Sequence, residues 1–286
     1  MQIVHCHILL AMSADRADAA STEWDATAYH RIATPQFTWG QKVLDRLALR
    51  GDETAIDAGC GSGRLTALLM ERLPHGRVIA VDRSENMLQA ARAYLEPRFG
   101  ERVSFLRSDL EALPLDAVAD LIFSTATLHW IPDHLTLFRS LYRALKPGGR
   151  LVAQCGGGPN LAHLLSRAAA LMATAPYDQF FARWSGPWEF ADAATTAERL
   201  RTAGFIDVET SLEPAPTLFP GADDYRAFVR TAIFRLHLER LPDEQLRATF
   251  LDTVTAQAAH DDPPFSLDYW RLNLRGTRLP ACGTPP

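Results

Sequence analysis

The sequence predicts an α/β protein built on a doubly wound, mostly parallel sheet. Five apolar runs of strand length lie between residues 54 and 155, and stretches with helical periodicity separate them. Such runs are typical of strands covered on both faces of a parallel sheet, and right-handed crossovers place the connecting helices there. The 286 residues, 47% of them apolar, are enough for one large domain with additions.

The expected elements alternate regularly. An amphipathic helix at 37–49 comes first, and strands are expected at 54–59, 77–82, 102–109, 120–126 and 150–155. The helices between them are expected at 62–73, 84–95 and 132–145, with Ser84 as an N-cap and the Lys-Pro-Gly-Gly stretch at 146–149 as a helix stop. Beyond residue 155 the pattern predicts helices at 160–174 and 193–203, a strand at 205–214, two helices within 223–260 split at Pro242, and a last, antiparallel strand within 265–279.

Charge and cysteine usage exclude several classes of protein. The formal net charge is −5, and no basic face predicts nucleic-acid binding. No apolar run approaches the ~20 residues that span a bilayer, and the N-terminus lacks a basic leader, so we predict a cytoplasmic protein. Residues 1–11 are interpreted as an upstream-start artefact or a disordered tail. The four cysteines are scattered, which predicts independent reduced thiols and no metal site; they are Cys6, Cys60, Cys155 and Cys282.

A glycine-rich turn after the first strand carries an acid at its mouth. Gly59, Gly61 and Gly63 let the backbone approach a ligand closely, and the helix that follows offers free N–H groups. The alternatives are a tight turn without a ligand, a dinucleotide site and a site for S-adenosylmethionine (SAM). The dinucleotide fingerprint needs a glycine where Arg64 stands, and Asp57 would repel a pyrophosphate. SAM carries an ammonium and a sulfonium, which a carboxylate attracts.

Acids also end the next two strands. Asp82 can accept hydrogen bonds from the ribose hydroxyls of either ligand class, and Asp109 can receive an adenine amino group. Carboxylates at three successive strand ends favour a cationic nucleoside over a polyphosphate.

Five motifs within about 53–155 resemble the class I SAM-dependent methyltransferases in order and spacing: AIDAGCGSG, VIAVDRSENML, FLRSDLEALPL, ADLIFSTATLHWI and ALKPGGRLV. The resemblance implies a seven-stranded sheet with its last strand antiparallel, and SAM as cofactor with S-adenosylhomocysteine as its product. It also implies cofactor contacts by Asp57, Gly59, Cys60, Gly61, Gly63, Asp82, Arg83, Met87, Asp109, Leu110, Ser124, Thr125 and Ala126. Cys60 is expected to contribute only its backbone, and a packed core methionine is the alternative for Met87.

The segment after the fourth strand, Leu-His-Trp-Ile-Pro-Asp-His, is similar to the trans-aconitate methyltransferase group of carboxylate O-methyltransferases. That likeness implies that Trp130 and Gln36 hold a substrate carboxylate. From their place in the sequence, Tyr29 is expected to cover SAM and Arg31 to pair with a second substrate anion. An aromatic core role for Trp130 and a solvated surface role for Arg31 are the alternatives. His129 stands where this group has Gln, and it could be a base, a carboxylate donor or a loop histidine.

The prediction is therefore a SAM-dependent methyltransferase that O-methylates a small carboxylic acid. A C- or O-methyltransferase of a quinone, phenol or natural-product hydroxyl, with His129 as base, and a non-catalytic SAM-binding protein are the alternatives. The expected organisation is a partly disordered tail and lid element at 1–30, the methyltransferase domain at 31–279 and a tail at 280–286. Within the domain we expect a core at 51–158 and helical lid insertions at about 177–190 and 221–260. Expected partners are a small-molecule acceptor and neither nucleic acid nor membrane, in a monomer or homodimer.

Overall fold

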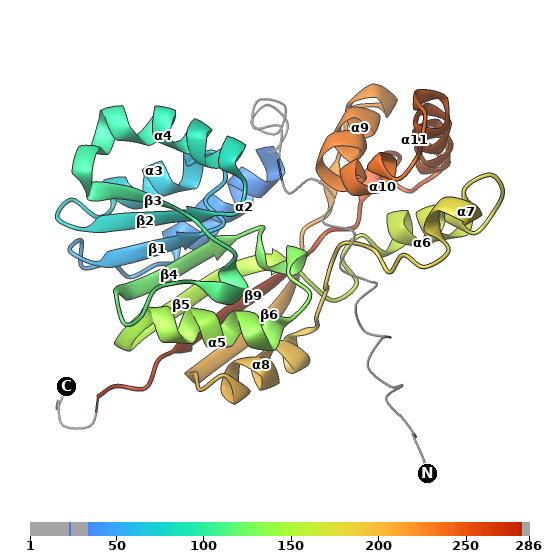
Figure 1. The fold of residues 1–286 in the computed structure, drawn as a ribbon. Helices are drawn as coiled ribbons and strands as arrows, with labels where there is room; N and C mark the ends of the chain where they lie inside the picture. The colour runs from blue at the N-terminus through green and yellow to red at the C-terminus, as the bar shows by residue number, and fades with distance from the viewer. Residues whose placement is uncertain (1–22, 24–33, 282–286) are drawn as a thin grey trace, which may run out of the picture.

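The computed structural model describes residue 23 and residues 34–281, and a seven-stranded sheet organises most of them (Figure 1). The strand order is β3-β2-β1-β4-β5-β9-β6. The strands are β1 (Thr54–Ala58), β2 (Arg77–Asp82), β3 (Val103–Arg107), β4 (Ala119–Thr125), β5 (Leu145–Gly156), β6 (Ile206–Pro214) and β9 (Trp270–Thr277). Strands β1 to β5 pair in parallel, whereas β9 pairs antiparallel with both β5 and β6. The predicted sheet with an antiparallel last strand is confirmed.

Helices cover both faces of the sheet. One face carries α2 (Thr34–Asp45), α3 (Arg64–Glu71) and α4 (Glu85–Phe99), and the other carries α5 (His134–Ala144) and α8 (Ala193–Thr202). Short 3₁₀ turns complete the connections; they are η1 (Gly100–Arg102), η2 (Leu110–Ala112) and η3 (Leu128–Trp130). Leu121 and Phe123 of β4 pack towards α2 and α3, while Ile122 packs towards α5. The strands are therefore buried on both faces, as their continuous apolar runs predict.

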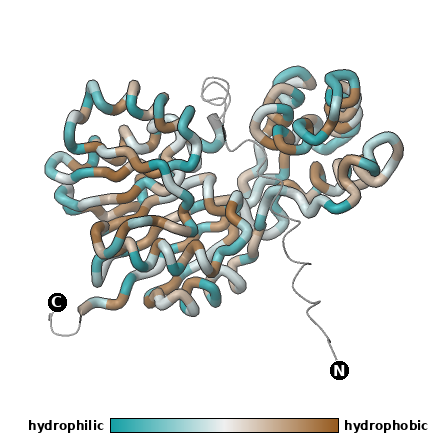
Figure 2. The backbone as a smooth tube through the Cα atoms, viewed as in Figure 1, coloured by the Kyte–Doolittle hydropathy of each residue, from teal (hydrophilic) through white to brown (hydrophobic). Residues whose placement is uncertain are grey.

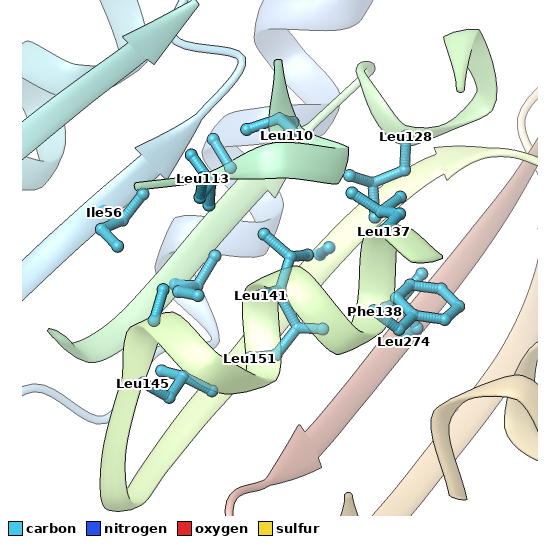
Figure 3. Packing of buried hydrophobic residues seen from close by; sticks show 14 of the residues in the cluster. Ile56, Leu110, Leu113, Leu128, Leu137, Phe138, Leu141, Leu145, Leu151 and Leu274 are labelled. Atoms are coloured by element: carbon cyan, nitrogen blue, oxygen red, sulfur yellow. The ribbon is translucent and has the colours of Figure 1, made fainter. Parts of the chain in front are cut away.

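The largest core lies between the sheet and α5 (Figure 3). Leu137, Phe138 and Leu141 line one side of α5 and are at most 1% exposed. They pack against Ile56 of β1 and Leu151 of β5. This core fixes the ends of β1, β4 and β5, from which the functional segments start.

A second group of helices has an apolar core of its own. Its members are α6 (Ala162–Met172), α7 (Asp178–Phe181), α9 (Ala222–Phe228), the π-helical turn η4 (Val229–Ile233), α10 (Arg235–Glu239) and α11 (Glu244–Ala258), with the short pair β7 (Thr217–Leu218) and β8 (Ser266–Leu267). Tyr225, Phe234 and Phe250 are fully buried in this core. The helices stand together beyond the carboxyl ends of the parallel strands (Figure 1). Hydrophobic and hydrophilic residues alternate along them (Figure 2), and the buried hydrophobic ones pack into one cluster.

Two boundaries differ from the sequence prediction. Strand β5 begins at Leu145, so the predicted helix stop at 146–149 is part of an irregular strand. Gly148 has a φ of +79° and donates its N–H to the Arg278 carbonyl, and this accommodates the irregularity. The region 223–260 breaks at Phe234 as well as near Pro242, because the Phe234 N–H bonds the Val229 carbonyl in a π-helical turn.

Ser84 caps α4 as predicted, and its Oγ accepts the Met87 N–H. The hydroxyl also donates to Glu23, whose carboxylate accepts the N–H groups of Glu85 and Asn86. The remaining residues of the predicted N-terminal tail and lid element, Tyr29 among them, lie outside the described residues, as do Arg31, Cys6 and Cys282. No helix within the described residues is long and apolar enough to cross a membrane.

Candidate functional site

A pocket opens at the carboxyl ends of the parallel strands. Its wall is formed by the β1–α3 turn, the ends of β2 and β4, the segments around η2 and η3, the start of β9 and a turn of η4. Ligands of doubly wound sheets bind at this edge, where neighbouring crossovers leave in opposite directions.

The three glycines of the β1–α3 turn have different structural roles. All three have positive φ, of +83° at Gly59, +53° at Gly61 and +84° at Gly63. A Cβ on Gly59 would overlap the Thr127 side chain, and one on Gly63 would lie 2.8 Å from Leu95 Cδ1. A Cβ on Gly61 would meet nothing within 4 Å, and Gly61 lines the pocket. Gly61 therefore presents bare backbone to a ligand, whereas Gly59 and Gly63 allow close packing.

Asp57 is a buried carboxylate in the pocket wall. It is 2% exposed and accepts a 2.6 Å hydrogen bond from Thr66 Oγ1. Burial, followed by the charge of Asp82, raises its pKa to about 7 despite this hydrogen bond. A cation beside Asp57 would reverse both effects, since it favours the ionised form.

Asp82 and Asp109 are fixed by backbone donors. Asp82 accepts the Gly61 N–H at 3.0 Å and the Ser84 N–H at 2.9 Å, while burial raises its pKa. Asp109 caps η2 by accepting the Glu111 N–H at 3.0 Å. The sheet order β3-β2-β1 therefore brings the three predicted acids side by side.

His129 is held in one protonation state. It is 9% exposed, and its Nδ1 accepts the Gly156 N–H at 3.3 Å. Burial first, and then the charges of Arg271 and His134, hold its pKa well below the usual value. A neutral imidazole that accepts at Nδ1 carries its proton on Nε2. His129 is thus a hydrogen-bond donor at Nε2 and a poor base.

Sequence reasoning missed Arg271, a cation at the start of β9. It is 4% exposed and lines the pocket, with Nη2 donating to Asn160 Oδ1 at 2.8 Å and Nε donating to the Trp270 carbonyl at 3.0 Å. No motif marks Arg271, and it reaches the site only because the antiparallel register places it opposite Gly156. The one available signal was an arginine near the start of a predicted strand, next to the apolar Trp270 and Leu272.

Most of the predicted site residues meet in this pocket. The lining includes Asp57, Gly59, Cys60, Gly61, Asp82, Arg83, Met87, Asp109, Leu110, Thr125 and Ala126, together with Gln36, His129 and Trp130 from the acceptor prediction. Gly63 and Ser124 do not line it, because Gly63 packs on Leu95 and the Ser124 hydroxyl donates to the Ala58 carbonyl at 2.6 Å. Ala126 has a φ of +54°, an uncommon conformation for a residue with a side chain.

Further lining residues were absent from the prediction. Trp188, Phe190, Ile233 and Tyr269 come from segments far apart in the sequence, and they give the pocket an apolar wall. Gln36 Oε1 is buried there without a hydrogen-bond partner among the described residues. Within those residues, no group of three His, Cys, Asp or Glu side chains could hold a metal ion. The predicted absence of a metal remains a prediction.

Comparison with known proteins identifies relatives. A model described as "Methyltransferase domain" matches residues 56–153. A trans-aconitate 2-methyltransferase of Methylobacterium radiotolerans is 32% identical over 260 residues, covering 85% of this chain and 92% of that protein. One from Azoarcus sp. (strain BH72) is 41% identical over 131 residues, about half of its own length.

The fold has counterparts among solved structures. Phosphoethanolamine N-methyltransferase 2 of Haemonchus contortus, solved with SAM, superimposes with a TM-score of 0.58 at 18% identity. The superposition covers 90% of this chain and 57% of that one. At this identity the likeness shows the shared fold.

Proposed function

Because this chain belongs to the class I SAM-dependent methyltransferases, we propose that it transfers a methyl group to a carboxylate oxygen of a small-molecule acid. SAM is the cofactor, and when bound it supplies a methyl group already activated by its sulfonium. The chain's own residues then have to bind the two reactants, align them and exclude water.

The pocket fits the cofactor at its acidic end. Gly61 leaves room for the methionine portion beside Asp57, Gly59 and Cys60. Because burial raises the pKa of Asp57, an ammonium beside this carboxyl would stabilise its charged form. In this proposal Asp82 accepts the ribose hydroxyls, Asp109 and Leu110 meet the adenine, and Arg83 and Met87 lie along the adenosine. Thr125 and Ala126 lie beneath the sulfonium. Gly63 and Ser124 do not line the pocket; Gly63 packs against Leu95, and Ser124 holds β4 to β1 by its hydrogen bond to the Ala58 carbonyl.

One observation carries the choice of acceptor, and it is the state of His129. A hydroxyl or phenol usually benefits from a base, whereas a carboxylate is already an anion at neutral pH. His129 has a pKa well below its usual range and donates at Nε2, so it suits an anionic acceptor. It would hold one acceptor oxygen while the other attacks the methyl group.

The surrounding groups agree with this assignment. Trp130 and Phe190 flank the His129 ring, with ring centroids 5.4 and 5.7 Å away. Their apolar surfaces strip water from the acceptor carboxylate, which raises its reactivity. Gln36 also lines the pocket, and its amide can turn its NH₂ group towards an acceptor oxygen. The relatives named trans-aconitate 2-methyltransferase also support an acid as acceptor.

The test is a screen with methyl-labelled SAM. Small carboxylic acids are each paired with the corresponding primary alcohol and amide, and phenols are included. We expect label in methyl esters, identified by mass spectrometry and by release of methanol on alkaline hydrolysis. Label in phenol ethers or on carbon, with no ester, would refute the proposal.

Two variants of His129 sharpen the test. His129→Gln keeps an N–H donor near the Nε2 position and has no titrating group, whereas His129→Leu removes the donor. We expect the Gln variant to retain most of the wild-type kcat with an acid and the Leu variant to lose it. Equal loss in both variants, together with a pH profile that follows histidine deprotonation, would identify a base instead.

A further inference from the structure

The two ends of the pocket carry opposite charge. Within the described lining, the four carboxylates all belong to β1, β2 and the segment after β3; they are Asp57, Asp82, Asp109 and Glu111. Arg64 and Arg83 line that same end. At the other end, the ends of β4 and β5 and the start of β9 present neutral His129 and the cation Arg271. The sheet order places these two groups on opposite sides of the β1–β4 junction.

Arg271 is held in a fixed position at this end. Asn160, itself 3% exposed, accepts both the Arg271 Nη2–H and the Trp270 N–H on its Oδ1. The guanidinium carbon lies 4.5 Å from the ring centroid of Trp39 and 5.1 Å from that of Tyr269. Rings on its faces and neutral oxygens on its edge orient a planar fork of donors that matches a carboxylate.

Arg271 also lies close to the proposed reaction centre. Its Nη2 is 3.2 Å from where a Cβ on Gly156 would stand, and the Gly156 N–H bonds His129 Nδ1. The positive charge of Arg271 is felt at His129, whose pKa it lowers. One small acid can therefore reach both residues.

We propose that Arg271, oriented by Asn160, binds a carboxylate of the methyl acceptor at the β5–β9 end of the pocket. The inference rests on the proposed function, since it names the residue that recognises the acid. Arg271 contacts the acceptor, and Asn160 is a positioning residue that acts through Arg271. Burial strengthens the attraction, because a guanidinium and a carboxylate interact more strongly away from water.

The first experiment measures binding without turnover. Tricarballylate is titrated calorimetrically into the protein saturated with S-adenosylhomocysteine. We expect wild type to bind and Arg271→Met to lose at least about tenfold in affinity, the equivalent of ~1.4 kcal/mol. Arg271→Lys keeps the charge without the fork and should recover part of that loss. The affinity of each variant for S-adenosylhomocysteine reports whether the fold is intact.

A matched control lies on the same strand. Arg275 is four residues along β9, on the same face of the sheet, and its exposed side chain pairs with Glu209. Arg275→Met makes the same substitution at a position outside the pocket. It should leave the affinities for tricarballylate and for S-adenosylhomocysteine unchanged. Wild-type affinity for tricarballylate in Arg271→Met, with intact binding of S-adenosylhomocysteine, would overturn the proposal.

The Asn160→Asp variant tests whether Asn160 positions Arg271 for the acceptor or only stabilises the fold. The replacement is isosteric and keeps the oxygen that Arg271 and Trp270 donate to, but its charge competes with the acceptor for Arg271. We expect KM for the acid to rise by about tenfold or more with a smaller change in kcat, and unchanged cofactor affinity. A purely structural role predicts nearly normal KM in this variant.

The outcomes distinguish the two proposals. If wild type forms methyl esters and Arg271→Met keeps the same KM, the proposed function stands and the role of Arg271 is wrong. If the wild-type protein methylates only neutral acceptors, but binds tricarballylate and the Arg271→Met variant does not, the anion site stands and the proposed function is wrong. If wild type binds no tricarballylate and methylates no acid, both are wrong.

Discussion

The two ends of the pocket differ in how they are built. At the acidic end, which is the proposed cofactor end, Asp57, Gly61 and Asp82 lie within 26 residues of one another along the chain. Each is one of the last two residues of a strand or lies in the turn that follows one. At the β5–β9 end, which is the proposed acceptor end, His129, Asn160 and Arg271 come from segments up to 142 residues apart and meet only through the register of β5 with β9. Local backbone geometry therefore fixes the cofactor end, whereas long-range packing fixes the acceptor end.

The largest effect is expected at the glycine turn. Gly59→Ala places a Cβ on the Thr127 side chain at a φ of +83°, so it should destabilise the protein by about 2–5 kcal/mol and abolish cofactor binding. Gly61→Ala adds a Cβ in open space, so it should cost only about 1–2 kcal/mol of strain while it obstructs the cofactor. Thermal denaturation and calorimetric titration of S-adenosylhomocysteine measure both. Equal loss of stability in the two variants would show that the turn packs differently.

Asp57→Asn should move stability and cofactor affinity in opposite directions. The folded-state pKa of about 7 lies above the unfolded value near 3.9, so the contribution of Asp57 to wild-type stability is fully present below about pH 4 and is lost as pH rises to about 7. Asn carries no charge, so the variant should gain in Tm over wild type at pH 8 and not at pH 4. Its affinity for SAM should fall.

Wild-type affinity supplies the matching pH test. Between pH 5.5 and 7, affinity for SAM should increase as Asp57 ionises, by up to about tenfold per pH unit, while the SAM amino group stays protonated. Asp57→Asn should show no such slope. A slope that persists in the variant would assign the titration to another group.

Gly156→Ala should weaken the acceptor end alone. The added Cβ would lie 2.8 Å from Phe190 Cε1, 2.9 Å from Asn160 Nδ2 and 3.2 Å from Arg271 Nη2. These are side-chain ends that can shift, so the fold should survive while the anion site is displaced. We expect affinity for tricarballylate to fall by about fivefold to tenfold, with unchanged affinity for S-adenosylhomocysteine, both measured by calorimetry. Loss of cofactor affinity in this variant would show that the two ends of the pocket are not structurally independent.

This contrast explains how far the sequence could be interpreted. The strands, the glycine turn and the positions of Asp57, Asp82 and Asp109 follow from apolar runs and the residues that end them. Arg271 and Phe190 could not be found this way, because their place depends on pairing and packing between distant segments. The sequence also left the role of His129 open, since its protonation state depends on a hydrogen bond from Gly156 and on burial.

The smallest effect is expected at Cys60. Its substitution tests whether a side chain that lies at the cofactor end also takes part in cofactor binding. Cys60 is 8% exposed, and burial, followed by the charges of Asp82 and Asp57, raises the pKa of its thiol well above the usual value. A thiol that stays protonated is a weak nucleophile, so Cys60 should react slowly with iodoacetamide at pH 8. Cys60→Ala should change affinity for S-adenosylhomocysteine by less than about twofold, because the backbone at this position is unaltered. Cys155→Ala is the control, since Cys155 is a buried thiol in β5 that does not line the pocket. If Cys60→Ala abolished cofactor binding and Cys155→Ala did not, the side chain of Cys60 would belong to the site and geometry alone would no longer account for the glycine turn.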